Sequence, residues 1–196
     1  MTRRAILSII GFVTAALAVW WLFVAVPRWY GGDGEPGTPE GAPPGATADA
    51  QRKITATLYY VGEDGMSLVP AQREVPFGEP IVEQARHILE AQLAAPVPPL
   101  VSAIPDGTTL RALYLSERGE VFVDLSGEVN TKHTGGSMDE ILTVYTIVNS
   151  LTVNLPALTR VQILIDGKEV DTLAGHVDLR NPLSKNLTWI KTDNPS

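Results

Sequence analysis

The chain contains 196 residues, of which 44% are hydrophobic and 19% are charged, and it carries a formal net charge of −7. This length allows one domain with a full hydrophobic core, but it is too short for two ordinary domains beside a membrane anchor. The acidic balance disfavours a nucleic-acid partner, and the lack of cysteine excludes disulfides, thiolate nucleophiles, cysteine-ligated metals and an N-terminal lipidated cysteine.

The first predicted element is a membrane-spanning helix over residues 5–26, within an N-terminal region of residues 1–30. The segment carries no charge, and roughly 22 residues in a helix span about 33 Å, which matches the hydrocarbon core of a bilayer. Arg3 and Arg4 precede it, and its far end is rich in aromatic side chains. We therefore expect a single-pass protein of the inner (plasma) membrane, with a cytoplasmic N-terminus and an extracytoplasmic C-terminal domain.

A cleaved secretory signal, including one of the twin-arginine type, is the alternative interpretation of this segment. The apolar run is longer than a normal signal core, and no small-x-small cleavage site precedes Pro27. We therefore favour an uncleaved anchor. Either interpretation places the rest of the chain outside the cytoplasm.

Residues 31–51 have the composition of a disordered linker. They are mainly glycine, proline, alanine and threonine with a few acids, and they include no large apolar side chain. Such a segment cannot bury enough apolar surface to offset the entropy lost on ordering. We expect a tether with a root-mean-square reach of roughly 25 Å between the membrane helix and a globular domain over residues 52–192.

The globular part begins with a predicted β-hairpin and a helix. Residues 54–61 and 67–75 are rich in β-branched and aromatic side chains, and the turn residues 62–65 lie between them. Residues 81–95 then repeat apolar side chains at helical spacing. This pattern predicts a helix that ends before Pro96.

A second hairpin and a second helix follow in the sequence. Residues 109–115 and 120–125 predict two further strands. Ser137 and Glu140 have the spacing of a capping box, in which each side chain bonds to the backbone of the other residue. The apolar spacing predicts a helix from there to about Asn154.

The last predicted strand covers residues 161–165, which are almost entirely apolar and therefore typical of a central strand. Together the elements predict an α+β fold with the order β-β-α-β-β-α-β. In this fold a mixed β-sheet carries two helices packed on one face, and the single transmembrane helix precedes it.

Four segments of this domain resemble the germane (GerMN) domain family, which is named after a spore germination and sporulation protein of endospore-forming bacteria. They are LYYV at residues 58–61, VFVDLSGE at 121–128, DEILTVYTIVNSLT at 139–152 and VQILIDGKEVDTLAGHVDLRNPL at 161–183. The resemblance covers essentially residues 54–189. It implies an α-β-β-α-β fold with an added N-terminal hairpin, in a domain held outside the cytoplasm. Family members often carry two such domains or a neighbouring peptidoglycan-associated module, and the resemblance implies no catalytic residues.

Three histidines are the main candidates for catalytic or metal chemistry. His87, His133 and His176 could be combined with carboxylates into a metal site, but their spacing matches no known ligand pattern. The candidate carboxylates are Asp124, Glu128 and Asp178. A hydrolase centre could be drawn from Ser150 or Thr152 with a histidine as base, although helical hydroxyls usually bond back to the preceding turn. We predict no catalytic residue, no metal ligand and no cofactor.

The densest polar segment, residues 175–183, lies in the most family-like stretch of the chain. A structural role explains it best, because Asp178 and Asn181 can fix turns through side-chain to backbone hydrogen bonds. The alternative is a partner or ligand surface that comprises His176, Asp178, Arg180 and Asn181.

The sequence favours a membrane-anchored, extracytoplasmic GerMN-like module of the bacterial cell envelope that is not an enzyme. We expect it to bind or assemble with an envelope protein or with peptidoglycan, while residues 5–26 contact the membrane. The alternative is an envelope hydrolase or a metal-dependent enzyme. An enzyme requires convergent polar groups in a deep pocket, whereas a binding module needs only a shallow surface or an exposed strand edge.

Overall fold

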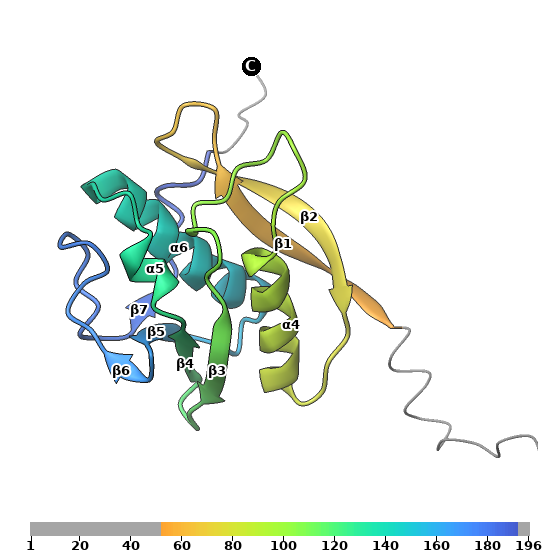
Figure 1. The fold of residues 1–196 in the computed structure, drawn as a ribbon. Helices are drawn as coiled ribbons and strands as arrows, with labels where there is room; N and C mark the ends of the chain where they lie inside the picture. The colour runs from red at the N-terminus through yellow and green to blue at the C-terminus, as the bar shows by residue number, and fades with distance from the viewer. Residues whose placement is uncertain (1–51, 192–196) are drawn as a thin grey trace, which may run out of the picture. The chain divides into compact units, whose positions relative to one another are not determined.

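The computed structural model describes residues 52–191 (Figure 1). The predicted transmembrane helix over residues 5–26 and the predicted linker over residues 31–51 lie outside the described residues. Within the described part of the chain, no helix has the length and apolar character that a membrane crossing requires.

The first two strands form the predicted β-hairpin. β1 (Lys53–Val61) and β2 (Leu68–Pro76) pair antiparallel along their whole length. Asp64 fixes the turn between them, because its carboxylate accepts the backbone N–H groups of Met66 at 2.9 Å and Ser67 at 3.1 Å. Two β-branched and aromatic runs around a fixed turn therefore form the hairpin that the sequence predicts.

Five strands form a second, mixed sheet. Four of them lie in the order β3 (Leu110–Leu115), β4 (Glu120–Leu125), β5 (Arg160–Ile165) and β6 (Lys168–Glu169), and β7 (Leu183–Ser184) also pairs with β5. β3 and β4 form the predicted hairpin, whereas β4 and β5 are parallel and are joined through a helix. The predicted central position of residues 161–165 is confirmed, since β5 pairs with β4, β6 and β7. It is not the last strand, because the two-residue strands β6 and β7 follow it, and these were too short for the sequence pattern to predict.

Two long helices pack on one face of this sheet, as predicted. They are α4 (Ile81–Leu93) and α6 (Ser137–Asn154), and a single short turn, α5 (Glu128–Thr131), precedes α6. The main core consists of buried side chains from both long helices and from the facing strands, among them Leu89, Val123, Ile147, Val161 and Ile163.

The prediction of a single sheet is wrong. The β1–β2 hairpin is a separate two-stranded sheet, and it packs against the helices instead of extending the main sheet. Leu58 and Tyr60 on one face of β1 pack with Ile88 of α4, while Tyr59 on the opposite face packs with Leu142 of α6. β1 therefore contacts both helices, and each helix contacts both sheets (Figure 1).

Helix α6 explains why a second sheet is needed. The sequence predicts one apolar stripe on this helix, but Thr146, Asn149 and Ser150 are also fully buried. A helix with a second buried side needs cover beyond a single sheet face. The hairpin supplies part of this cover, and the C-terminal segment supplies more, because Asn149 bonds to the backbone of Asn186. Because these three residues are polar, the spacing of apolar residues in the sequence could not predict that this second side of α6 is buried.

Two amide side chains close the outer backbone edge of β1. Asn154 bonds to both the N–H and the C=O of Thr57, and Gln92 bonds to both backbone groups of Tyr59, each at 2.8 Å. The amides take the place of a neighbouring strand, so the buried backbone groups of β1 are satisfied.

Candidate functional site

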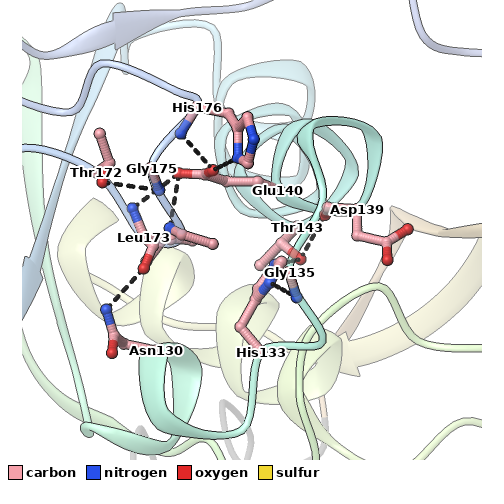
Figure 2. A network of polar contacts seen from close by, with 11 residues as sticks. Asn130, His133, Gly135, Asp139, Glu140, Thr143, Thr172, Leu173, Gly175 and His176 are labelled. Carbon is pink, nitrogen blue, oxygen red and sulfur yellow. Dashed lines mark hydrogen bonds and ion pairs between the residues drawn. The ribbon is translucent and has the colours of Figure 1, made fainter.

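Glu140, in the first turn of α6, carries a fully buried carboxylate. Its Oε1 accepts the backbone N–H groups of Leu173 and Ala174, both at 2.9 Å. Its Oε2 accepts the backbone N–H of His176 at 2.8 Å and lies 3.1 Å from Nδ1 of the same histidine. Figure 2 shows these bonds reaching the helix from one loop. Glu140 therefore ties the loop of residues 172–176 to the start of α6.

The predicted capping box at this helix end is wrong. Gly136, with a φ of 93°, is the N-cap residue, and no side-chain hydrogen bond caps the helix. Ser137 is the first residue of the helix itself. Glu140 turns away from the cap because the loop offers it several N–H donors, whereas a capping box offers only one.

Two opposing effects set the pKa of Glu140. Burial raises the pKa of this carboxyl, but the backbone N–H groups of Ala174, Val177, His176 and Leu173 together outweigh burial and hold the pKa below its ordinary value. The carboxylate is therefore ionised at neutral pH, and the positive end of the α6 dipole favours the same state. These properties suit a group that positions a loop and do not suit a proton donor.

Two more side-chain contacts shape the same loop. Nδ2 of Asn130 donates to the C=O of Leu173 at 2.7 Å, and the N–H of Gly175 donates to Oγ1 of Thr172 at 2.9 Å (Figure 2). Gly175 has a φ of 98°, a left-handed conformation that favours glycine. The loop is therefore fixed from α5, from α6 and by its own backbone.

His133 lies in the segment that leads into α6. Its Nδ1 accepts the backbone N–H of Gly135 at 3.0 Å, so the neutral ring carries its proton on Nε2, which donates to Oγ1 of Thr143 at 3.2 Å. The Thr143 hydroxyl donates in turn to the C=O of Ala103 at 2.6 Å. The imidazole thus links the residues before α6 to the helix (Figure 2), and the Thr143 hydroxyl continues the connection to the loop that precedes β3.

An open pocket of about 220 Å³ adjoins His133. Its walls come from the end of β1, the loop before β3 and the start of α6, and they include Val61, Ile104, Lys132, Asp139 and Leu142. Two other hollows of the described domain measure about 210 and 270 Å³. All three are smaller than the roughly 300–1,000 Å³ of typical small-molecule sites.

The four residues of the predicted partner surface lie along one segment, but they do not converge on one another. Nε of Arg180 lies 2.9 Å from Oδ1 of Asp178, and Nη2 lies 2.7 Å from Oδ2, so the two side chains form a bidentate pair. Oδ1 also accepts the backbone N–H of Arg180 at 3.0 Å, and Asp178 therefore fixes a turn. His176 is turned toward Glu140, and Asn181 is exposed.

The hydrogen bonds from Arg180, first from its side chain and then from its backbone N–H, lower the pKa of Asp178 to about 2. Both side chains are more than half exposed, at 66% for Arg180 and 53% for Asp178. The pair is therefore a surface feature that a partner can reach.

The hydroxyls that were candidates for a hydrolase centre have structural partners. Oγ of Ser150 is fully buried and lies 2.7 Å from both the C=O of Thr146 and Oε1 of Gln92. The Thr152 hydroxyl donates to the C=O of Val148 at 2.8 Å. Both hydroxyls thus bond back to the preceding turn of their helix, as such hydroxyls usually do.

The histidines and carboxylates that were considered for a metal site are dispersed. Nδ1 of His87 lies 3.1 Å from the C=O of Pro76, far along the chain from the contacts of His133 and His176. Among residues 52–191, no three His, Asp or Glu side chains are grouped so that they could hold a metal ion.

Sequence comparison decides the family of this domain. The family described as "Germane: Sporulation and spore germination" matches residues 57–171, which is more than half of the chain. The chain belongs to this family. The resemblance found in the sequence is therefore confirmed, and a search of curated proteins adds no match.

Solved structures share the fold of this GerMN domain. A candidate lipoprotein from Clostridium perfringens is 22% identical with a TM-score of 0.50, over 74% of this chain and 97% of that one. The tandem GerMN domains of the sporulation protein GerM from Bacillus subtilis are 22% identical with a TM-score of 0.55, over 68% of this chain and 46% of the tandem. The first GerMN domain of the same protein is 20% identical with a TM-score of 0.50, over 68% and 96% of the two chains. At these identities the likeness shows the fold alone.

Two of the segments that carry the GerMN resemblance meet at one end of the main sheet. Oδ1 of Asp124, from VFVDLSGE, accepts the backbone N–H of Gly167, from the turn between β5 and β6, at 2.7 Å. Nη1 of Arg111 lies 2.7 Å from Oδ1 of Asp166, and its Nε lies 3.8 Å from Oδ2 of Asp124. In this GerMN domain these motif residues hold a turn in place.

Glu140 and Asn130 are the site residues that sequence reasoning missed. The signal for Glu140 was present, because it lies four residues before the fully buried Val144, on the apolar side of α6. A single carboxylate on the buried side of a helix requires hydrogen-bond donors that are also buried. Asn130 gave no such signal, since its partner is a backbone carbonyl 43 residues away.

Proposed function

We propose that this protein is a membrane-anchored, extracytoplasmic GerMN module of the bacterial cell envelope that binds or assembles with an envelope protein or peptidoglycan and is not an enzyme. The observation that carries the proposal is the position of Glu140. Its ionised carboxylate is fully buried, and both of its oxygens are occupied by the loop of residues 172–176. The buried carboxylate of Glu140 thus fixes the position of the loop of residues 172–176.

The presented surface supports the binding role. Beyond the loop held by Glu140, the chain continues into the exposed pair of Asp178 and Arg180 and the exposed Asn181. These side chains are polar, rigidly oriented by the bidentate pair and accessible. Such a feature suits recognition of a polar or charged partner surface, and it requires no pocket.

The size of the pockets and the bonding of the candidate catalytic groups argue against the alternative of an envelope hydrolase or metal-dependent enzyme. Acid–base chemistry requires a nucleophile and a base within reach of the same open space. Here Ser150 is buried against Gln92, while both ring nitrogens of His133 are engaged by Gly135 and Thr143.

Two features support the proposed location. The uncharged run over residues 5–26 has the length and flanks of an anchor. A structure of the same fold comes from a candidate lipoprotein, a class of protein that is held at a membrane surface. Protease added to the outer side of intact membranes should digest the domain, whereas digestion from the cytoplasmic side of inverted vesicles would contradict the proposal.

A photo-crosslinking amino acid at Asn181 tests the binding role in native membranes. The control position is Arg118, which is also exposed but lies in the turn between β3 and β4. We expect a discrete crosslinked partner, protein or peptidoglycan, from position 181 and none from position 118. Equal crosslinking from the two positions would mean that the segment after Glu140 is not the binding surface.

A further inference from the structure

Four exposed apolar side chains lie on the turn of the β1–β2 hairpin and on the two segments that flank it. Met66 is 62% exposed, Val97 60%, Val101 57% and Leu187 50%. The only other large hydrophobic side chains exposed among residues 52–191 are two neighbours on β3. We call the four side chains the apolar end. Isolated exposed apolar residues are ordinary, but four at one end of a small domain indicate a contact surface.

Backbone bridges hold the three segments of the apolar end together. The N–H of Val61 donates to the C=O of Val101 at 2.9 Å, which attaches the loop before β3 to the end of β1. On the other side, the N–H of Leu68 donates to the C=O of Trp189 at 2.7 Å, which attaches the C-terminal segment to the start of β2. Figure 1 shows the hairpin turn and these two segments at the same end of the domain.

A buried cluster supports these segments from below. Tyr59, Leu68 and Leu142 form its centre, and Trp189 and Ile190 pack against it. The segments that carry the apolar side chains therefore rest on packed structure. The exposure of these side chains is a property of the fold.

We propose that the apolar end docks onto the lipid bilayer in which the same chain is anchored. This inference rests on the anchor over residues 5–26 in the proposed function. Residues 27–51 connect that anchor to the domain, and a coil of about 25 residues, as their composition predicts, would have a root-mean-square reach of roughly 25–30 Å. β1 has nine residues and is therefore about 30 Å long. The connection can thus bring the far end of the hairpin to the membrane, although it joins the domain at the near end.

Because the domain is tethered to the bilayer, even a weak contact with lipid is sufficient to keep it docked. A domain held within a few tens of ångströms of a bilayer meets it at high effective concentration, so a small apolar surface can remain docked. Trp189, which is half-buried beside the apolar end, has the amphipathic ring that prefers the membrane interface.

The charges beside the apolar end define the lipid chemistry. Glu63 and Asp64 lie in the same turn as Met66 and are exposed, and Lys191, whose backbone N–H donates to the C=O of Leu68, supplies a positive charge beside them. The two carboxylates outnumber Lys191, so the contact disfavours anionic headgroups. We therefore expect the apolar end to bind the interface of zwitterionic lipid, and added anionic lipid should weaken this binding.

The lack of cysteine in this chain allows a clean experiment. The full chain is reconstituted into phosphatidylcholine vesicles with a single environment-sensitive label at M66C, and brominated lipid is added as quencher. The control label is at Y114C, because Tyr114 is 61% exposed but lies on β3. We expect quenching at position 66 to exceed that at position 114 by at least about twofold, as for a side chain at the interface. Equal quenching would overturn the proposal.

Two further arms separate the causes of a negative result. Flotation of the vesicles tests the anchor itself. A chain that does not float would contradict both the anchor and the docking. A chain that floats but shows equal quenching at the two positions would contradict the docking alone. V101D in the M66C background should abolish the difference between the two labels, and added phosphatidylglycerol should reduce it. Excimer formation between pyrene labels at position 66, without lipid quenching, would assign the surface to a second copy and would also overturn the proposal.

Discussion

The side-chain amide of Gln92 forms two hydrogen bonds with the backbone of Tyr59, one to the N–H and one to the C=O, each at 2.8 Å. Gln92 lies on α4 and Tyr59 on β1, and both are buried. One side chain therefore supplies what a neighbouring strand would supply, and it fixes the position of the hairpin against the helices.

Replacing Gln92 with leucine should destabilise the domain by about 2 to 4 kcal/mol. The change keeps the volume but leaves two buried backbone groups without partners, each of which costs roughly 1–3 kcal/mol. Urea denaturation of the full chain in detergent, followed by tryptophan fluorescence, measures the loss. The matched control is Gln72→Leu on β2, where the side chain is exposed and only contacts Thr57, and where we expect a change within about 0.5 kcal/mol. Equal effects of the two variants would show that the amide bonds do not hold the hairpin.

The second prediction concerns the carboxylate that holds the loop of residues 172–176. Glu140→Gln should cost about 2 to 4 kcal/mol, because the amide nitrogen must face N–H donors in a site where both oxygens now accept. Asp139→Asn is the matched control in the same helical turn, since that side chain is exposed and bonds only to Thr134. Denaturation curves of the two variants should therefore differ clearly, and coincident curves would contradict the role given to Glu140.

The same residues show how far the sequence could predict the site. The strands, both long helices and the central position of β5 follow from apolar spacing and turn residues, which are local signals. The separate hairpin layer and the loop anchored on Glu140 depend on contacts 33 to 97 residues apart, made by Gln92, Asn154 and Glu140. The first-turn position of Glu140 fits a capping box equally well, and only the packed structure decides between the two partners.

The third prediction is a pH dependence at Asp178. Its folded pKa of about 2 lies below the ordinary value of 3.8, because Arg180 stabilises the ionised form. A lowered pKa means that the stabilisation is fully present above pH of about 4 and is lost as the pH falls toward 2. Carboxyl carbon shifts from nuclear magnetic resonance should give the lowered pKa directly, and Arg180→Gln should return it toward 3.8. A normal pKa in the unaltered chain would mean that the pair does not persist in solution.

The fourth prediction separates the binding module from an enzyme through its two site histidines. His176→Ala removes one contact to Glu140 but leaves the backbone N–H bonds of the loop, so stability and crosslinking at Asn181 should change little. His133→Ala removes the acceptor of the Gly135 N–H and a partner of Thr143, so amide exchange at Gly135 should accelerate while the rest of α6 stays protected.

Melting curves, amide exchange and crosslinking yield of the double variant His133→Ala/His176→Ala decide between the two functions. If both rings have a structural role, the crosslinking yield should fall only where the melting temperature falls or amide exchange accelerates in the segments that the rings contact. An enzyme that uses either ring as a base predicts the opposite, with an unchanged melting temperature and a lost cellular function. Because His133 already uses both ring nitrogens within the domain, we expect the first result. Complementation by the double variant would then show that the cellular function does not require the two imidazoles.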